Sequence, residues 1–331
     1  MPTVAVIIVN YNAGDLLPEC LRAVEAQTVR PARVLVMDNG SRDGSIDRCR
    51  AEFGSVEFHS LNENLGFARA NNLGVELVPE CDWVALLNPD AFPEPSWIEA
   101  FCRGVAEYPQ ADAFASYMLS ARQPGIIDGA GDTYRVDGVA WPRYQGVATA
   151  QLPKGMQEVF TPCAGAGFYR RESFVQVGGF NEEYFCYHED VDLGFRLRLM
   201  GAQCLFLEGA VVHHVGSAIA GKGSDFSLYH VHRNIIWTFV RNMPSPYLWY
   251  YLPAHILMNV AALCWFTYSG RAGIIWRAKT DAIKALPDIC RQRRKIQAAR
   301  RVSPHAVVSR MEDGTILRSL FRQAVARLWA R

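Results

Sequence analysis

Three short groups of polar side chains hold the atoms that could perform chemistry in this chain. The first is Asn88-Pro89-Asp90, which follows a run of five apolar residues, 83–87. A carboxylate with a carboxamide two residues before it suits a hard divalent cation that holds phosphates. The alternative is a loop in which Asp90 is merely solvated or caps the next turn.

The second group is the acidic run from Glu189 to Asp192, which opens an apolar pattern typical of a helix ending at Gly201. One carboxylate of its first turn could take a proton from a hydroxyl group. The alternative is structural, because acids there complement the helix dipole and cap N–H groups, worth about 1 kcal/mol. The third group is His213 and His214 at the end of a strand, where imidazoles can bind a metal ion or a phosphate.

Alternating strands and helices must position these groups. Apolar or mixed runs predict strands over residues 4–9, 33–37, 56–58, 83–87, 114–119, 137–143 and 205–207. Helical spacing of apolar residues predicts helices over residues 16–24, from Gly66 to about residue 78, and over 189–200. This alternation predicts an α/β fold with a mostly parallel, doubly wound central sheet. Ligands bind such sheets at the carboxyl ends of the strands, where Asp90 lies.

Other kinds of site are excluded by the residues present. The loop after the first strand, residues 10–14, lacks the G-x-G-x-x-G of a dinucleotide-binding turn. Residues 216–223 fit G-x-x-x-x-G-K but end in Gly223, where a phosphate-binding loop needs Ser or Thr for magnesium. The nine cysteines are scattered without a C-x-x-C pair, so we expect reduced thiols of a cytosolic protein. No secretory signal is expected, because the first strand lacks a basic segment before it.

Taken in order, the motifs resemble the family 2 glycosyltransferases of GT-A fold, over roughly residues 3–245. The matching segments are V-N-Y-N after the first strand, D-N-G-S-x-D-G-S, N-x-G-F-A-x-x-x-N, L-L-N-P-D and H-E-D-V-D-L-x-x-R. Within the family, the N-P-D and E-D-V-D-L segments and residues 229–234 are most similar to bacterial rhamnosyltransferase-type enzymes of cell-surface polysaccharide synthesis. The resemblance implies an inverting enzyme that uses a nucleotide-sugar donor.

The resemblance also implies a role for each matching position. On the donor side these positions are Asn10, Tyr11, Asn12, Asp38, Gly66, Phe67, Ala68, Asn71, Asn88, Asp90 and Arg233. Asp38 would recognise the edge of a uracil- or thymine-type base, so a UDP- or dTDP-linked donor is favoured. Arg233 would contact the diphosphate or an acceptor phosphate.

A divalent cation, Mg²⁺ or Mn²⁺, is implied on the donor diphosphate, where it would offset the charge of the leaving group. Asp90 would bind this cation, and His214 would complete the site, with His213 as the alternative ligand. Asn88 stands where many relatives carry Asp, and one carboxylate fewer weakens this predicted metal site.

Catalysis is implied for the acidic run. Asp190 resembles the family's base, which deprotonates an acceptor hydroxyl for in-line attack at the anomeric carbon, and Glu189 is the second candidate. Arg196 could orient these acids or form a structural ion pair. On the acceptor side, the small residues Gly165, Ala166 and Gly167 let backbone approach a ligand closely or, alternatively, pack sheet on helix.

The C-terminal part combines an uncharged stretch with a basic one. Residues 242–270 contain no Asp, Glu, Lys or Arg, and Pro253, His255 and Asn259 interrupt their apolar pattern. We therefore expect an embedded or re-entrant hairpin there rather than a full membrane span.

Residues 271–331 carry 15 Lys/Arg against 4 Asp/Glu, a net charge of +11 in a chain whose total is +1. Residues 316–329 predict a basic amphipathic helix suited to an anionic bilayer surface. The alternative is packing on the body or on a second subunit. Nucleic acid is not expected, because the aromatic residues do not interleave with basic ones on a sheet face.

These features predict two units: a GT-A domain over residues 1–240, with a donor half (1–112) and an acceptor half (113–240), and a membrane-associating helical region over 241–331. The expected function is transfer of rhamnose or a related hexose to a polyprenyl-diphosphate-linked glycan by a peripheral or monotopic protein at the cytoplasmic face of the inner membrane. The alternatives are a sugar nucleotidyltransferase and a non-catalytic sugar-binding protein of the same fold. The sequence leaves open whether the chain forms a homodimer.

Overall fold

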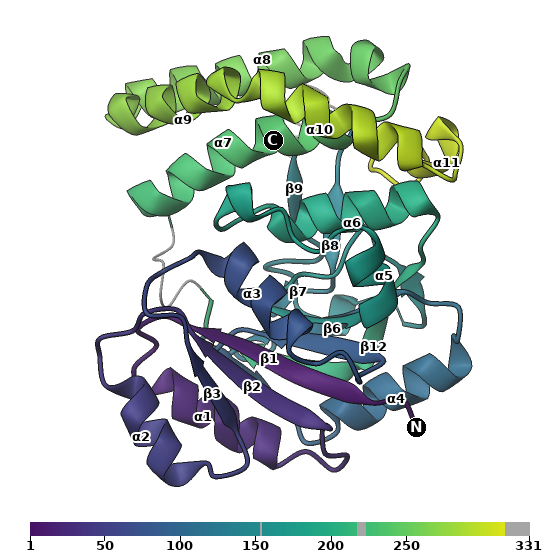
Figure 1. Ribbon diagram of the computed structural model, residues 1–331. Coiled ribbons are helices and arrows are strands. Elements are labelled where there is room, and N and C mark those ends of the chain that lie inside the picture. Colours follow the sequence, from purple (N-terminus) through teal and green to yellow (C-terminus); the bar gives the residue numbers. More distant parts are fainter. Residues whose placement is uncertain (153, 217–222, 315–331) are drawn as a thin grey trace, which may run out of the picture.

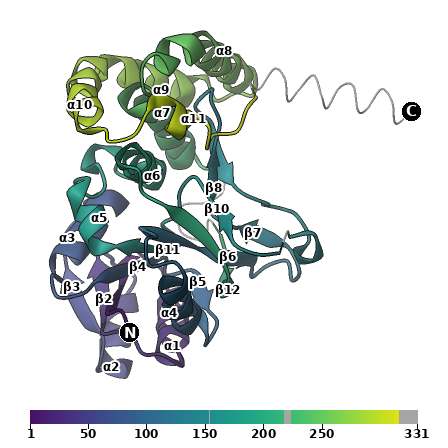
Figure 2. The same ribbon diagram turned by 90° about the vertical axis from the view of Figure 1, so that its right-hand side faces the viewer.

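A mixed β-sheet with helices on both faces forms the lower body of the protein, and a layer of helices covers its upper end (Figure 1). The computed structural model describes residues 1–152, 154–216 and 223–314. Figure 2 shows the same two parts from the side, with α6 (Glu189–Met200) and the strand β8 (Asp132–Tyr134) lying between them.

The main sheet runs in the order β10-β12-β6-β11-β4-β1-β2-β3, with β5 paired to β12 and β7 paired to β6. Its strands are β1 Val4–Asn10, β2 Arg33–Asp38, β3 Glu57–Ser60, β4 Trp83–Leu87, β5 Ala91–Pro93, β6 Ala113–Ser120, β7 Ile127–Gly129, β10 Gln157–Glu158, β11 Ala166–Arg170 and β12 Cys204–His214. β1 to β4 are parallel and β12 is parallel to β6, whereas β11 is antiparallel to both of its neighbours. The predicted mostly parallel α/β sheet is confirmed.

Two apolar cores lie on the two faces of this sheet. Along β1, Val4, Val6 and Ile8 face one core, and Ala5 and Ile7 face the other, as strand alternation requires. The helices of the first core are α1 Leu16–Glu25, α2 Ser45–Glu52 and α4 Trp97–Glu107, and those of the second are α3 Phe67–Glu76, α5 Arg171–Gln176 and α6. Because β1 is buried on both faces, its sequence is a continuous apolar run.

Several strand predictions need correction. The strand predicted over residues 56–58 is β3, which starts one residue later, at Glu57, and extends to Ser60. The strand predicted over 137–143 is instead a hairpin of β8 with β9, Ala140–Pro142. The strand predicted over 205–207 continues past an irregularity between Leu207 and Val211 and ends at His214. β12 therefore contains both this segment and the strand predicted to end at the two histidines.

The upper layer consists of α7 Asp225–Asn242, α8 Tyr247–Tyr268, α9 Ala272–Lys284, α10 Leu286–Ala299 and α11 Pro304–Val308. The prediction of a hairpin within residues 247–268 is wrong, because α8 continues through Pro253 as one helix. None of the helices in the described ranges has the length and apolar character needed to cross a membrane. The amphipathic helix predicted over 316–329 lies outside the described residues.

The polar residues of α8 explain how this uncharged helix packs. His255 is buried, and its Nδ1 lies 2.8 Å from the carbonyl oxygen of Asp137. The Asn259 amide donates to the His255 carbonyl at 2.8 Å, and its oxygen accepts from the ammonium of Lys279 on α9. His255 and Asn259 therefore face inward, toward the turn between β8 and β9 and toward α9, whereas Pro253 is exposed.

Candidate functional site

Pairing of β5 with β12 brings together two residues that are far apart in the sequence. His214 lies opposite Ala91 in this antiparallel pair, and the N–H of Val215 donates to the carbonyl oxygen of Asp90 at 2.9 Å. The side chains meet as well, because His214 Nε2 lies 3.4 Å from Asp90 Oδ1. On the other side of the ring, Nδ1 lies 2.7 Å from Asp128 Oδ2.

The Asp90–His214 pair fits a divalent cation. Two ligand atoms on one ion, each about 2.1 Å from it, lie about 3 Å apart in octahedral geometry, close to the observed separation. His214 Nε2 is buried and makes no hydrogen bond within the described ranges. In the absence of a cation, burial opposes the charged imidazole, but the hydrogen bond to Asp128 and the neighbouring Asp90 carboxylate outweigh it and raise the pKa of His214 to about 9.

His213 points away from this pair, as strand alternation requires. Its Nε2 lies 3.0 Å from Glu94 Oε1, and both side chains are close to half exposed. Of the two predicted histidines, His214 is therefore the one that lies beside Asp90. Whether either histidine is a cation ligand stays a prediction.

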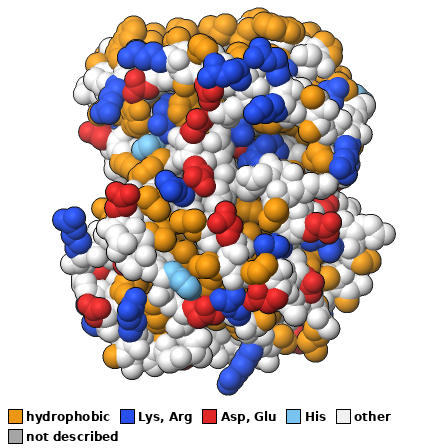
Figure 3. All heavy atoms as spheres, in the orientation of Figure 1, with side chains coloured by type: hydrophobic (Ala, Val, Ile, Leu, Met, Phe, Trp, Pro, Cys, Tyr) orange, Lys and Arg blue, Asp and Glu red, His pale blue; other side chains and the backbone are white. Residues whose placement is uncertain are grey.

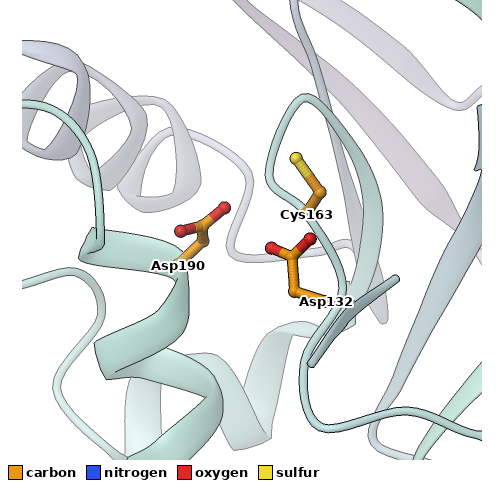
Figure 4. A group of neighbouring side chains, drawn as sticks. All are labelled: Asp132, Cys163 and Asp190. Atoms are coloured by element: carbon orange, nitrogen blue, oxygen red, sulfur yellow. The ribbon is translucent and has the colours of Figure 1, made fainter. Parts of the chain in front are cut away.

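A second cluster surrounds the start of α6 (Figure 4). It consists of Asp190, Asp132 and Cys163, whose ligand atoms all lie within 4.8 Å of one another. Asp190 is partly exposed and Asp132 is buried. Asp190 Oδ1 accepts from the N–H of Val191 at 2.8 Å, and Oδ2 accepts from the N–H of Ala164 at 3.1 Å.

These carboxyl groups differ in how their charged forms are stabilised. Burial raises the pKa of Asp190, but two backbone N–H donors counteract this by stabilising the carboxylate. Burial and the nearby Asp190 charge hold the pKa of Glu189 well above its usual range, and its Oε2 has no hydrogen-bond partner within the described ranges. Burial and Asp190 also raise the pKa of Asp132. Asp190 is therefore the carboxyl best suited to be ionised and accept a proton.

The segment before β11 joins the two clusters. The N–H of Asn88 donates to the carbonyl oxygen of Gly165 at 2.8 Å, next to the Ala164–Asp190 bond. β11 then pairs with β4, with Ala166 opposite Leu87. A Cβ on Gly167 would lie 2.8 Å from the Cys163 carbonyl oxygen, so close backbone packing requires this glycine. A contact of residues 165–167 with an acceptor stays a prediction.

The predicted base-recognition residues lie together at the ends of β1 and β2. Asn10 is buried and donates through Nδ2 to Ser41 Oγ at 2.9 Å. Asp38 Oδ1 accepts from the N–H of Ser41 at 3.1 Å, and Asn12 Oδ1 accepts from the N–H of Arg42 at 2.8 Å. Tyr11 is 39% exposed, so its ring is free to cover a ligand. These contacts shape one loop, and its binding of a nucleotide stays a prediction.

The start of α3 is placed by the turn before α6. Ala68 donates its N–H to the carbonyl oxygen of Phe185 at 3.2 Å. Gly66 has φ of 85°, and a Cβ there would lie 2.6 Å from the Phe185 ring, so this position requires glycine. Asn71 is buried and donates to the carbonyl oxygen of Phe67 at 2.9 Å. The predicted donor contacts of residues 66–71 are not tested by these bonds.

The two predicted arginines make mainly structural contacts. Arg196 is buried, and its Nη2 lies 2.7 Å from Asp192 Oδ2, which favours the ion-pair alternative. The same carboxylate accepts from Arg241 Nη1 at 2.8 Å. Arg233 donates from Nη2 to the carbonyl oxygen of Tyr184 at 2.9 Å, and its contact with a phosphate stays a prediction.

Sequence reasoning missed two acids that help to build the site. Asp128 contacts His214, and Asp132 lies beside Asp190. Both belong to the segment Asp128-Gly129-Ala130-Gly131-Asp132, which has no strong helix or strand pattern. The only signal in the sequence is the pair of acids flanking small residues.

Comparisons with known proteins identify the family of the chain. Residues 5–178 match the family described as glycosyl transferase family 2. An N-acetylglucosaminyl-diphospho-decaprenol L-rhamnosyltransferase of Mycobacterium tuberculosis is 33% identical over 233 residues, which are 63% of this chain and 75% of that protein. The O-antigen chain rhamnosyltransferase RfbN of Salmonella typhimurium is 23% identical over 227 residues, 64% of this chain and 66% of that protein.

The fold has a counterpart among solved structures. The crystal structure of GalNAc-T7 with UDP, GalNAc and Mn²⁺ superposes with a TM-score of 0.62 at 14% identity. The match covers 77% of this chain and only 50% of that chain, so this chain spans about half the length of that protein. The family match covers more than half of the present sequence. The chain belongs to glycosyl transferase family 2 and is an inverting glycosyltransferase of GT-A-like fold.

Proposed function

We propose that the chain moves a sugar, rhamnose or a related hexose, from a nucleoside-diphosphate donor to a hydroxyl group of a lipid-linked glycan. The observation that carries this proposal is that Ala164 and Gly165 connect Asp190 with Asn88, at the start of the turn that carries Asp90. The names of the two relatives support rhamnose as the sugar. The name of the Mycobacterium tuberculosis relative also supports a polyprenyl diphosphate as the carrier of the acceptor. The loop at Asn10 and Asp38 supports a dTDP- or UDP-linked donor.

In the proposed reaction, Asp190 accepts the proton of the acceptor hydroxyl as its oxygen attacks the anomeric carbon. The bond from that carbon to the diphosphate oxygen breaks on the opposite face, so the configuration inverts. The backbone donors Ala164 and Val191 hold the Asp190 carboxylate in place during this step. Glu189 is the second candidate for the base.

Asp90 and His214 would hold a divalent cation, Mg²⁺ or Mn²⁺, which would offset the charge of the departing diphosphate. The separation of their ligand atoms and the unbonded Nε2 of His214 support this assignment. Asn88 is engaged through its backbone N–H with Gly165, so its predicted donor contact would come from its side chain.

The upper layer would bring the active site to a membrane surface at its cytoplasmic face. Hydrophobic side chains line the top of the molecule along α8, and Lys and Arg side chains form a band below them (Figure 3). Trp249 is 67% exposed, Trp265 64% and Trp276 55%. Exposed tryptophans beside basic residues suit the interface of an anionic bilayer, and a lipid-linked acceptor would lie in that plane.

Calorimetric titration with UDP, dTDP and GDP, each with Mn²⁺ or EDTA, tests the donor site. We expect one nucleotide to bind in a cation-dependent manner. Product analysis with the matching nucleotide-rhamnose and a polyprenyl-diphosphate-linked N-acetylglucosamine then tests transfer. A folded protein that binds none of the three nucleotides would refute the proposal, and donor binding without transfer or hydrolysis would favour a non-catalytic sugar-binding protein.

A further inference from the structure

The turn that leads into α6 adopts a backbone conformation that needs external support. Phe185, Tyr187 and His188 have φ of 65°, 67° and 67°. A non-glycine residue with positive φ is strained, and this conformation persists only where its surroundings enforce it. Since this turn ends at Glu189 and Asp190, its conformation sets where the proposed base lies.

The support comes from Asn234, a fully buried residue of α7. Its amide nitrogen donates to the carbonyl oxygens of Tyr184, Cys186 and Tyr187 at 3.1, 3.0 and 2.7 Å. One amide group therefore donates hydrogen bonds to three carbonyl oxygens of the turn. Alanine at this position would remove this donor from the carbonyl oxygens of Cys186 and Tyr187, and buried carbonyls without donors are costly. The Tyr184 carbonyl oxygen would keep the bond from Arg233 Nη2.

Asn234 is in turn fixed by its neighbours. Its Oδ1 accepts from Arg233 Nε at 2.8 Å, and its carbonyl oxygen accepts from the Thr238 hydroxyl at 3.0 Å. Arg233 Nη2 also donates to the carbonyl oxygen of Glu183 at 3.0 Å. The amide is thus oriented before it meets the turn, as a positioning group must be.

The same turn reaches the donor side. The Phe185 carbonyl oxygen accepts from Ala68 at the start of α3, and the Phe185 ring packs against Gly66. A shift of the turn would therefore move the start of α3 relative to Asp190. The two halves of the active site share this connection.

We propose that Asn234 is a positioning residue, which fixes the turn of residues 184–188 so that Asp190 and the start of α3 keep one relative placement. It touches no reacting atom. The inference rests on the proposed role of Asp190, and it gives a physical purpose to the downstream segment 229–234.

Two variants and one matched control test the inference. Asn234→Ala removes the amide, and Asn234→Ser, which keeps one donor, covers the case that the alanine variant does not fold. Tyr229→Phe removes a different α7 hydrogen bond, the one to Asp281, without touching the turn. Circular dichroism and thermal melting establish that each variant is folded.

Two readouts are measured on the full chain. We expect kcat to fall about 100-fold in the Asn234 variants, while the Kd for the nucleoside diphosphate with Mn²⁺ changes less than about threefold. We also expect alkylation of Cys186 to accelerate about tenfold, because opening of the turn exposes its thiol. Peptide mass analysis identifies Cys186, and the exposed Cys264 and Cys290 serve as internal references.

Either of two results would overturn the inference. One is unchanged Cys186 alkylation in folded Asn234 variants. The other is a kcat that stays at the wild-type level, or that falls only in parallel with nucleotide affinity. Tyr229→Phe should leave both readouts unchanged. If the wild-type protein transfers no sugar, the proposed function fails, but the alkylation measurement still decides whether Asn234 holds the turn.

Discussion

The backbone N–H of Ala164 donates a 3.1 Å hydrogen bond to Oδ2 of Asp190. The next residue, Gly165, accepts from the N–H of Asn88 at 2.8 Å. The segment that stabilises the proposed base as a carboxylate is therefore the same segment that hydrogen-bonds to the turn carrying Asp90.

Replacing the proposed base should abolish transfer but not donor binding. We expect Asp190→Asn to lower kcat by about 10³-fold, within the usual range for a general base, and to leave the nucleotide Kd nearly unchanged. Glu189→Gln is the matched control, because it neutralises the adjacent carboxyl. Steady-state assays at saturating donor compare the two variants. A greater loss in Glu189→Gln would transfer the role of base to Glu189.

The two adjacent histidines provide a matched pair for the cation site. We expect His214→Ala to weaken Mn²⁺-dependent nucleotide binding by about tenfold or more, because it removes one of two proposed ligands. His213→Ala should leave that affinity unchanged, since His213 faces Glu94. Calorimetry with Mn²⁺ and with EDTA measures both. Equal losses in the two variants would argue that neither histidine acts as a ligand.

Lys279 should make the stability of the upper layer depend on pH. This residue is buried beside the His232 carbonyl, and burial lowers the pKa of its ammonium to about 7. The unfolded chain keeps this proton up to about pH 10.4. Between these values the unfolded state binds more protons, so folding stability rises with pH by about 1.4 kcal/mol per unit. Below pH 7 both states are protonated, and this contribution no longer changes.

Urea unfolding of the wild-type protein and of Lys279→Met between pH 7 and 9.5 measures this effect. We expect the free energy of unfolding of the wild type, relative to that of Lys279→Met, to increase by about 1.4 kcal/mol per pH unit. Burial lowers the pKa of the neighbouring His232 to about 3, so this imidazole stays neutral across the window. Parallel curves for the two proteins would show that Lys279 keeps its proton in the folded state.

The exposed tryptophans of the upper layer should govern membrane binding. We expect Trp265→Glu to lower the fraction that floats with phosphatidylglycerol vesicles by about tenfold, because one large apolar contact is lost. Val175→Glu is the control, since Val175 is a 50% exposed apolar residue of α5 in the body. Vesicle flotation is combined with sedimentation analysis. Unchanged flotation together with a shift from dimer to monomer would mean that a second copy of the chain covers this face.

The central strands could be predicted because their signal is local. Residues 4–9 and 83–87 are apolar runs, and the structure buries β1 and β4 on both faces. The end of α6 was also predictable, since Gly201 adopts φ of 90°, a conformation that glycine tolerates. Each of these features is encoded within a few neighbouring residues.

Features that depend on distant pairing could not be predicted. Nothing near His214 indicates that β12 pairs with the three-residue strand β5, yet this pairing brings the His214 side chain beside Asp90. Asp132 begins a strand of only three residues that follows Gly129-Ala130-Gly131, so no local pattern marks this strand. α8 continues through Pro253, although proline removes one backbone donor. Its residues His255 and Asn259 contact Asp137 and Lys279, which are far away in the sequence or on another helix, so the local sequence does not reveal these contacts.

The pairing of β5 with β12 also determines when the enzyme becomes complete. The segment matched to the family, residues 5–178, contains Asp90 but ends before both Asp190 and His214. During synthesis, more than a hundred residues are therefore added after Asp90 before β12, which carries His214, is available to pair with β5. A fragment confined to the shared segment would lack its proposed base and one of its two proposed cation ligands, so the catalytic unit is larger than the unit by which the family is recognised.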